Sequence, residues 1–203
     1  NYDGQMRMIS PSPLGGHNWQ AMAFDPKSKL VFFPVHEMPG AYSLAKDFDP
    51  RTRSWNTGTG FEANLKVPDG WSEVVKGRLV AWDPIKQREA WRAEYKSAWN
   101  GGVLATAGDL VFEGTADGRF VAYRASDGKL LWQSPAGTGV VAAPITYLVD
   151  GEQYVTVMAG WGGVFPLAYG EAAARAEVTL APAVFREQGQ KPACMTPIPC
   201  MRR

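Results

Sequence analysis

The stretch Gly77–Trp91 reads GRLVAWDPIKQREAW, and the stretch Gly118–Trp132 reads GRFVAYRASDGKLLW. The second follows the first at an offset of 41 residues, and Gly, Arg, Val, Ala and Trp occupy matching positions in both. In each copy an alanine precedes the tryptophan by ten residues. Self-similarity at a fixed period of this size indicates a repeat architecture.

Each copy contains two β-rich runs joined by a turn, Asp83-Pro84 in the first and Ser126-Asp127-Gly128 in the second. Further strand-like runs surround the two copies: residues 22–24, 30–33, 102–106, 110–112, 142–149 and 154–158. The unit is therefore about four short strands per 41 to 45 residues. Because one small sheet cannot bury both of its faces alone, this period predicts stacked blades of a β-propeller, each a four-stranded antiparallel sheet.

The repeated tryptophans have a structural rationale in such blades. We expect Trp91 and Trp132 to lie between adjacent blades, each burying on the order of 200 Å². Ala81 and Ala122, placed opposite them, would leave room for the indoles. The alternative is that both are ordinary core aromatics, and neither interpretation gives them a catalytic role.

The composition is that of a turn-rich globular β protein. The chain has 203 residues, with 22 Gly and 15 Pro, and its formal net charge of +1 argues against a nucleic-acid binder. The uncharged stretch at residues 153–170 is too short and too rich in Gly and Pro to span a bilayer. His17 and His36 are the only histidines, and their spacing without patterned Cys or carboxylates argues against a zinc site.

Two regions depart from the repeat. Residues 35–70 read as a long surface loop within a propeller region spanning 1–170, and residues 171–203 read as an Ala/Pro-rich tail or linker. Cys194 and Cys200 lie in that tail, and the sequence leaves open whether they form a disulfide. Because the chain starts at Asn1 without Met, we expect either a processed leader or a piece of a longer chain.

Four motifs, in this order, resemble the C-terminal part of a pyrroloquinoline quinone (PQQ) dependent alcohol dehydrogenase. They are GHNWQAM at Gly16–Met22, WNGGVLATAG at Trp99–Gly108, GTADG at Gly114–Gly118 and AGWGG at Ala159–Gly163. The alanine-to-tryptophan pairs resemble the tryptophan-docking repeat of that family, and the Trp-Asn-Gly-Gly form resembles its quinohaemoprotein branch.

The resemblance implies an eight-bladed propeller with PQQ and Ca²⁺ in a funnel near its axis. In the family, an aspartate base takes the hydroxyl proton of a small alcohol while hydride passes to the quinone, and electrons continue to a cytochrome c in the periplasm. Eight blades need about 330 to 360 residues, so this chain resembles a partial ring of about three to four blades. A haem c in a neighbouring domain is compatible with the quinohaemoprotein branch.

Four residues of this chain match cofactor-contacting positions of the family. Asn18 matches an asparagine whose amide bonds the quinone, Trp99 matches an aromatic at the cofactor edge, and Asn100 and Trp161 are further candidates. The structural alternatives are that Asn18 bonds a loop backbone, that Trp99 belongs to the core, that Asn100 forms a turn and that Trp161 closes a blade. The calcium ligands and the catalytic aspartate of the family match no motif here, so we expect no catalytic or metal-binding residue in this segment, which would be incomplete as an enzyme.

The sequence leaves two other interpretations open, one of the function and one of the architecture. A non-catalytic propeller scaffold or interaction domain would share the repeat and the docking tryptophans, but would have no reason to keep Asn18 and Trp99 facing the axis. A self-contained propeller of four small blades is disfavoured by the irregular first 75 residues and by the lack of a fourth docking repeat.

Overall fold

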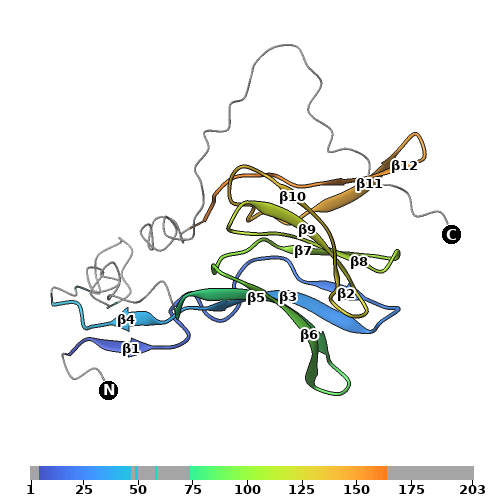
Figure 1. Ribbon diagram of the computed structural model, residues 1–203. Helices are drawn as coiled ribbons and strands as arrows, with labels where there is room; N and C mark the ends of the chain where they lie inside the picture. Colours follow the sequence, from blue (N-terminus) through green and yellow to red (C-terminus); the bar gives the residue numbers. More distant parts are fainter. Residues whose placement is uncertain (1–4, 47–48, 50–57, 59–73, 164–203) are drawn as a thin grey trace, which may run out of the picture.

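Short antiparallel strands follow one another along the chain and build successive sheets in the computed structural model (Figure 1). The structure describes residues 5–46, 49, 58 and 74–163. These residues form the following strands: β1 (Arg7–Ile9), β2 (Ala23–Asp25), β3 (Leu30–Glu37), β4 (Gly40–Tyr42), β5 (Lys76–Asp83), β6 (Arg88–Tyr95), β7 (Val103–Thr106), β8 (Leu110–Gly114), β9 (Arg119–Arg124), β10 (Leu130–Pro135), β11 (Ile145–Val149) and β12 (Glu152–Thr156).

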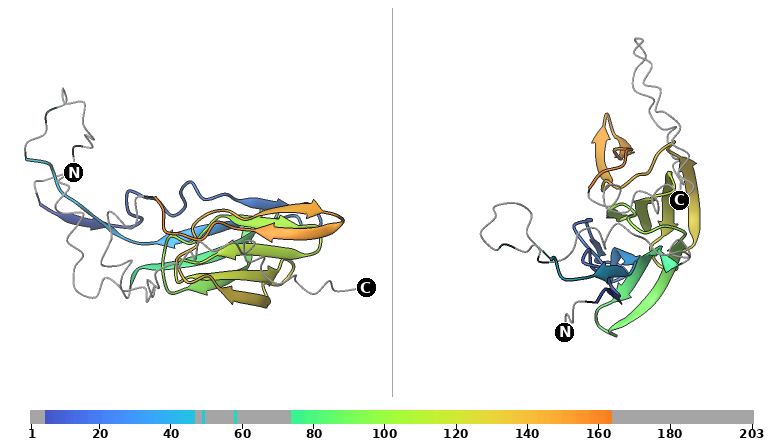
Figure 2. Two further views of the ribbon diagram at one scale, coloured as in Figure 1. Left: turned by 90° about the horizontal axis from the view of Figure 1, so that it is seen from above. Right: turned by 90° about the vertical axis from the view of Figure 1, so that its left-hand side faces the viewer.

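Two complete four-stranded sheets form the centre of the molecule. The first has the order β2-β3-β5-β6 and the second the order β7-β8-β9-β10, and all neighbouring strands are antiparallel. The hairpin β11-β12 follows the second sheet, and the views in Figure 2 show the sheets lying one after another. The innermost strands β2 and β7 contact each other, as adjacent blades of a propeller do. The fold is therefore all-β and forms part of a propeller ring, as predicted.

The burial of each strand reflects its place in this stack. In β3 buried residues alternate with partly exposed ones, the period of two expected of a strand whose two faces differ in burial. In β9 the four residues Phe120–Tyr123 are all buried, because their side chains belong alternately to the two apolar clusters on either face.

Two apolar clusters hold the sheets together. The larger one interleaves residues of the first two sheets: Leu30, Phe32, Leu79, Ala81, Tyr95, Val103, Val111, Val121, Tyr123 and Ala125. The smaller one, around Phe112 and Phe120, is joined by Trp132 and by Val155 and Val157 from the β12 region.

Trp91 joins the first two sheets as the repeat predicts. Its Nε1 donates to the backbone oxygen of Ala125 at 2.8 Å, and its ring lies against Gly128 in the β9–β10 turn. Strand register places Ala81 opposite Trp91, and Ala122 opposite Trp132, with a bulge beside each pair. Trp132 is half-buried and packs edge-on against Phe120 of its own sheet, with ring centroids 6.0 Å apart.

The predicted loop at 35–70 begins inside regular structure. Its first residues complete β3, and β4 then pairs with β1 in a separate two-stranded ribbon to one side of the stack (Figure 1). Most of its remainder, and the predicted tail at 171–203 with both cysteines, lie outside the described residues. Within the described ranges, no helix has the length and apolar character needed to cross a membrane.

Candidate functional site

The loop that carries Asn18 runs along the end of β3 and is fixed there by the backbone. The N–H of Ser12 donates to the oxygen of Met38, and the N–H of His36 donates to the oxygen of Gly16, both at 2.8 Å. The ring of His17 adds a third contact, 2.8 Å from its Nδ1 to the oxygen of Pro34. His17 is thus a local hydrogen-bond partner that positions the loop.

Asn18 is exposed at the tip of this loop. Its Nδ2 donates to the oxygen of Leu14 at 2.8 Å, and its Oδ1 accepts from the N–H of Trp19 at 2.9 Å. An amide nitrogen carries two N–H bonds, and in the described part of the chain only Leu14 accepts from this one. The Asn18 side chain therefore bonds the backbone of its own loop. It also keeps one N–H that can donate to a further partner.

Trp99 lies in the connection between β6 and β7 and is fully buried. Its backbone φ of +67° lies in the left-handed region, which bulky side chains seldom adopt. The rings of Trp19 and Trp99 meet edge to face, with centroids 6.4 Å apart and an angle of 73°. Gly163 lies beside both indoles, since a β-carbon there would be 3.3 Å from Trp99 Nε1 and 3.6 Å from Trp19 Cζ2.

The three motifs that contain Asn18, Trp99 and Trp161 thus meet at one end of the sheets. Trp161 itself packs beside Gly139, where a β-carbon would lie 2.6 Å from its Cε2. The Gly160 N–H donates to the Gly139 oxygen at 2.9 Å, which pins this segment to the β10–β11 connection. Trp161 precedes Gly163 by two residues, and its ring packs on the β10–β11 connection.

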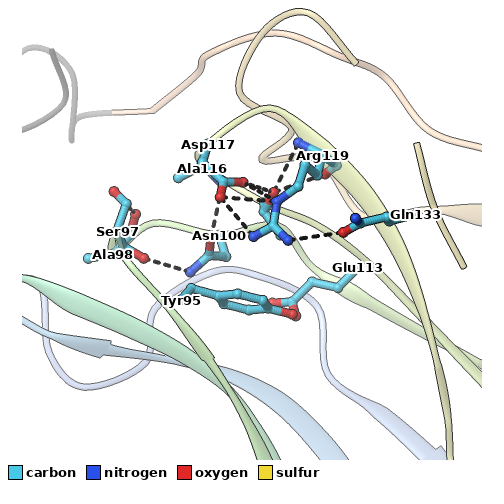
Figure 3. Close-up of polar contacts among 10 residues, drawn as sticks. Tyr95, Ser97, Ala98, Asn100, Glu113, Ala116, Asp117, Arg119 and Gln133 are labelled. Atoms are coloured by element: carbon cyan, nitrogen blue, oxygen red, sulfur yellow. Dashed lines mark hydrogen bonds and ion pairs between the residues drawn. The ribbon is translucent and has the colours of Figure 1, made fainter. Parts of the chain in front are cut away.

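Asn100 is 1% exposed and occupies both ends of its amide with backbone groups (Figure 3). Its Nδ2 donates to the oxygen of Ser97, and its Oδ1 accepts from the N–H of Ala116, each at 2.9 Å. It thereby ties the segment that carries Trp99 to the β8–β9 turn. This geometry favours a structural role for Asn100 in its turn over a contact with a cofactor.

His36 is a residue of this site that the sequence analysis did not identify. It is 2% exposed, and its imidazole stacks on the indole of Trp99 with centroids 5.0 Å apart and an angle of 27°. Its Nδ1 accepts from the Trp99 N–H at 3.2 Å, and its Nε2 lies 3.3 Å from Oε1 of Gln20. Burial, and secondarily the charge of His17, lowers the pKa of His36 to about 4, so the ring is neutral near pH 7.

A second buried polar pair joins the two sheets close to the segment that carries Trp99 (Figure 3). The hydroxyl of Tyr95, at the end of β6, donates to Oε2 of Glu113 in β8 at 2.6 Å (Figure 3). Glu113 is fully buried, and burial raises its pKa to about 8, an effect that the Tyr95 hydrogen bond partly offsets. Burial and the neighbouring carboxyl also raise the pKa of Tyr95. Both groups are therefore predominantly neutral at pH 7.

Three aspartates serve in turns, as the sequence predicts for Asp83 and Asp127. Backbone N–H groups donate to Asp25, Asp83 and Asp127, and these bonds contribute to lowering the pKa of all three carboxyls. Among the residues that the structure describes, no three His, Cys, Asp or Glu side chains group closely enough to hold a metal ion.

Comparison with known proteins gives consistent matches. Residues 70–155 match the family model described as PQQ: glucose/ethanol/alcohol dehydrogenase, beta-propeller domain. The chain is 49% identical over 171 residues to quinohemoprotein alcohol dehydrogenase ADH IIB of Pseudomonas putida, covering 84% of this chain and 24% of that protein.

Two solved structures are similar in both sequence and fold. Quinohemoprotein alcohol dehydrogenase ADHIIG from Pseudomonas putida HK5 matches with a TM-score of 0.76 and 43% identity, covering 86% of this chain and 26% of that one. The enzyme from Comamonas testosteroni matches with a TM-score of 0.72 and 45% identity, covering 81% and 25%. The chain thus spans about a quarter of the length of these relatives.

Proposed function

Because the chain belongs to the PQQ-dependent alcohol dehydrogenase family, we propose that it forms one wall of the quinone site of an enzyme that oxidises alcohols to aldehydes. The observation that carries this proposal is the meeting of Trp19, Trp99 and Gly163 beside the loop of Asn18. An exposed amide next to clustered indoles suits a planar, oxygen-rich ligand.

The described residues fit a quinone in two respects. One N–H of Asn18 has no acceptor in the described ranges, so it is available to donate to a quinone oxygen. Trp19 is 53% exposed and packs edge to face with the buried Trp99, so an aromatic surface is presented beside that donor. We assign Asn18, Trp99 and Trp161 to the cofactor wall, and Asn100 to the support of Trp99.

When bound, PQQ supplies a quinone carbonyl that accepts the hydride of an alcohol. The part played by this chain is electrostatic and positional: a fixed amide donor stabilises negative charge that develops on an oxygen, and the indoles exclude water from that face. The aspartate base and the calcium ligands belong to other parts of the propeller in this proposal. The proposal also includes a cytochrome c as electron acceptor, a haem c in a neighbouring domain and a periplasmic location.

The test uses the complete gene product, loaded with PQQ and Ca²⁺, with dye reduction by primary alcohols and the dissociation constant of PQQ as readouts. Asn18→Ala should lower the rate about 100-fold, the usual effect of losing one such donor, with little change in melting temperature. Gln153→Ala, which removes an exposed amide on the distant hairpin, should leave the rate unchanged. If the wild-type protein binds no PQQ at micromolar concentration, the scaffold interpretation replaces this proposal.

A further inference from the structure

His36 stands out because it is a buried polar side chain inside an apolar strand pattern. Leu30, Phe32 and Pro34 precede it at the buried positions of β3, so the same period directs His36 inward. A buried imidazole must satisfy both ring nitrogens or lose free energy. Its two partners, Trp99 and Gln20, are both buried as well.

The contacts of His36 with Trp99 act on both the backbone and the ring. The Trp99 N–H donates to Nδ1 at 3.2 Å, and the two aromatic planes stack at 5.0 Å. The hydrogen bond acts on a residue whose φ of +67° is intrinsically unfavourable for an aromatic residue. Such a conformation persists when its surroundings determine it from several directions.

Gln20 fixes the tautomer of this imidazole. Since Nδ1 accepts from Trp99, the proton lies on Nε2 and points to Oε1 of Gln20, 3.3 Å away. The Gln20 amide is thereby oriented with its oxygen toward His36. Its Nε2 has no acceptor among the residues that the structure describes, so the histidine contact is the one that orients this side chain.

We propose that His36, oriented by Gln20, is the positioning residue that holds the indole of Trp99 in the conformation in which it lines the quinone site. The inference rests on the proposed function for the role of Trp99. The hydrogen bond from Trp99 to Nδ1 sets the backbone, and the stacked imidazole sets the plane of the indole. His36 acts through Trp99, and no contact of its own with the quinone is required.

Two substitutions in the complete gene product separate the hydrogen bond from the packing. His36→Phe keeps a stacked ring and removes the acceptor, whereas His36→Asn keeps an acceptor near the position of Nδ1 and removes the ring. Val35→Thr is the control on the same strand, because Val35 precedes His36 in β3 and its side chain lies on the opposite face. The readouts are hydrogen exchange at the Trp99 amide in the PQQ-free protein and the dissociation constant of PQQ.

We expect His36→Phe to accelerate exchange at Trp99 at least 10-fold and to raise the PQQ dissociation constant at least 10-fold. His36→Asn should restore exchange to within about 3-fold of wild type and recover most of the affinity, and Val35→Thr should change neither quantity. Melting temperatures identify variants that fail to fold, and the exchange of a second amide in β9 corrects for global opening.

The inference is overturned if a folded His36→Phe protein keeps wild-type exchange at Trp99, or keeps wild-type PQQ affinity. It is also overturned if His36→Asn fails to slow exchange relative to His36→Phe. Failure of the proposed function has a different signature, because the wild-type protein then binds no PQQ while the exchange measurement still reports on Trp99.

Discussion

The indole of Trp91 lies against the backbone of Gly128 so closely that a β-carbon at position 128 would be 2.6 Å from Cδ2 and Cε3 of the ring. Trp91 belongs to the outer strand of the first sheet, and Gly128 belongs to the last turn of the second. The contact therefore sets the distance between two neighbouring sheets, and the hydrogen bond from Trp91 to Ala125 fixes its orientation.

Gly128→Ala should lower the free energy of unfolding by about 2–4 kcal/mol. Part of the cost is the left-handed φ of +73°, about 1–2 kcal/mol for a residue with a β-carbon, and the rest is overpacking against the indole. Gly137→Ala is the matched control, because Gly137 has a φ of +72° with nothing within 4 Å of the added carbon. Urea unfolding measures both variants. If they lose the same unfolding free energy, the Trp91 indole accommodates the added carbon and the overpacking contributes nothing.

Asn100→Ala should destabilise the protein by about 2–3 kcal/mol, because it leaves the Ala116 N–H and the Ser97 oxygen without their buried partner. Asn18→Ala should change stability by less than about 1 kcal/mol, since that side chain is exposed. Urea unfolding of the two variants makes the comparison. If Asn100→Ala keeps full stability and loses PQQ binding instead, Asn100 contacts the cofactor directly.

Glu113→Gln should become more stable relative to wild type as the pH rises from 5 to 8. The folded pKa of Glu113, about 8, lies above the ordinary value of 4.5, so the folded protein binds more protons than the unfolded chain between those limits. Stability from this group is complete below pH 4.5 and is lost as the pH rises through 8. Tyr95 and Tyr123, the titratable neighbours, also have raised pKa values and stay neutral over this range.

The measurement for Glu113 is the difference in unfolding free energy between variant and wild type at pH 5, 6.5 and 8. Subtracting the wild type removes the titration of groups common to both proteins. Glu94→Gln is the control for replacing an exposed glutamate beside Tyr95 in β6. A difference for Glu113→Gln that stays constant with pH would mean that Glu113 is already ionised in the folded protein at pH 5.

The elements that sequence predicts best are those determined by local chemistry and the repeat. The matching positions of Ala81 and Trp91 become a cross-strand pair in the structure, because an antiparallel hairpin brings residues ten apart to the same level. Asp83 and Asp127 form turns because their side chains bond backbone N–H groups two or three residues away. These contacts need no knowledge of distant parts of the chain.

The missed features are contacts between residues far apart in sequence. His36 and Trp99 are 63 residues apart, and neither neighbourhood indicates the other. The alternation of β3 provided one signal, since a histidine at a buried position requires polar partners. The pairing of β1 with β4 gave no such signal, because β1 is short and all of its residues are exposed.

The same two sheets are joined at separate points, by Trp91 with Gly128 at the outer strands and by His36 with Trp99 at the far end of β3. A single joint would let one sheet pivot about the other, whereas two joints restrain that rotation. The two sheets should therefore keep their relative orientation and move as one rigid unit.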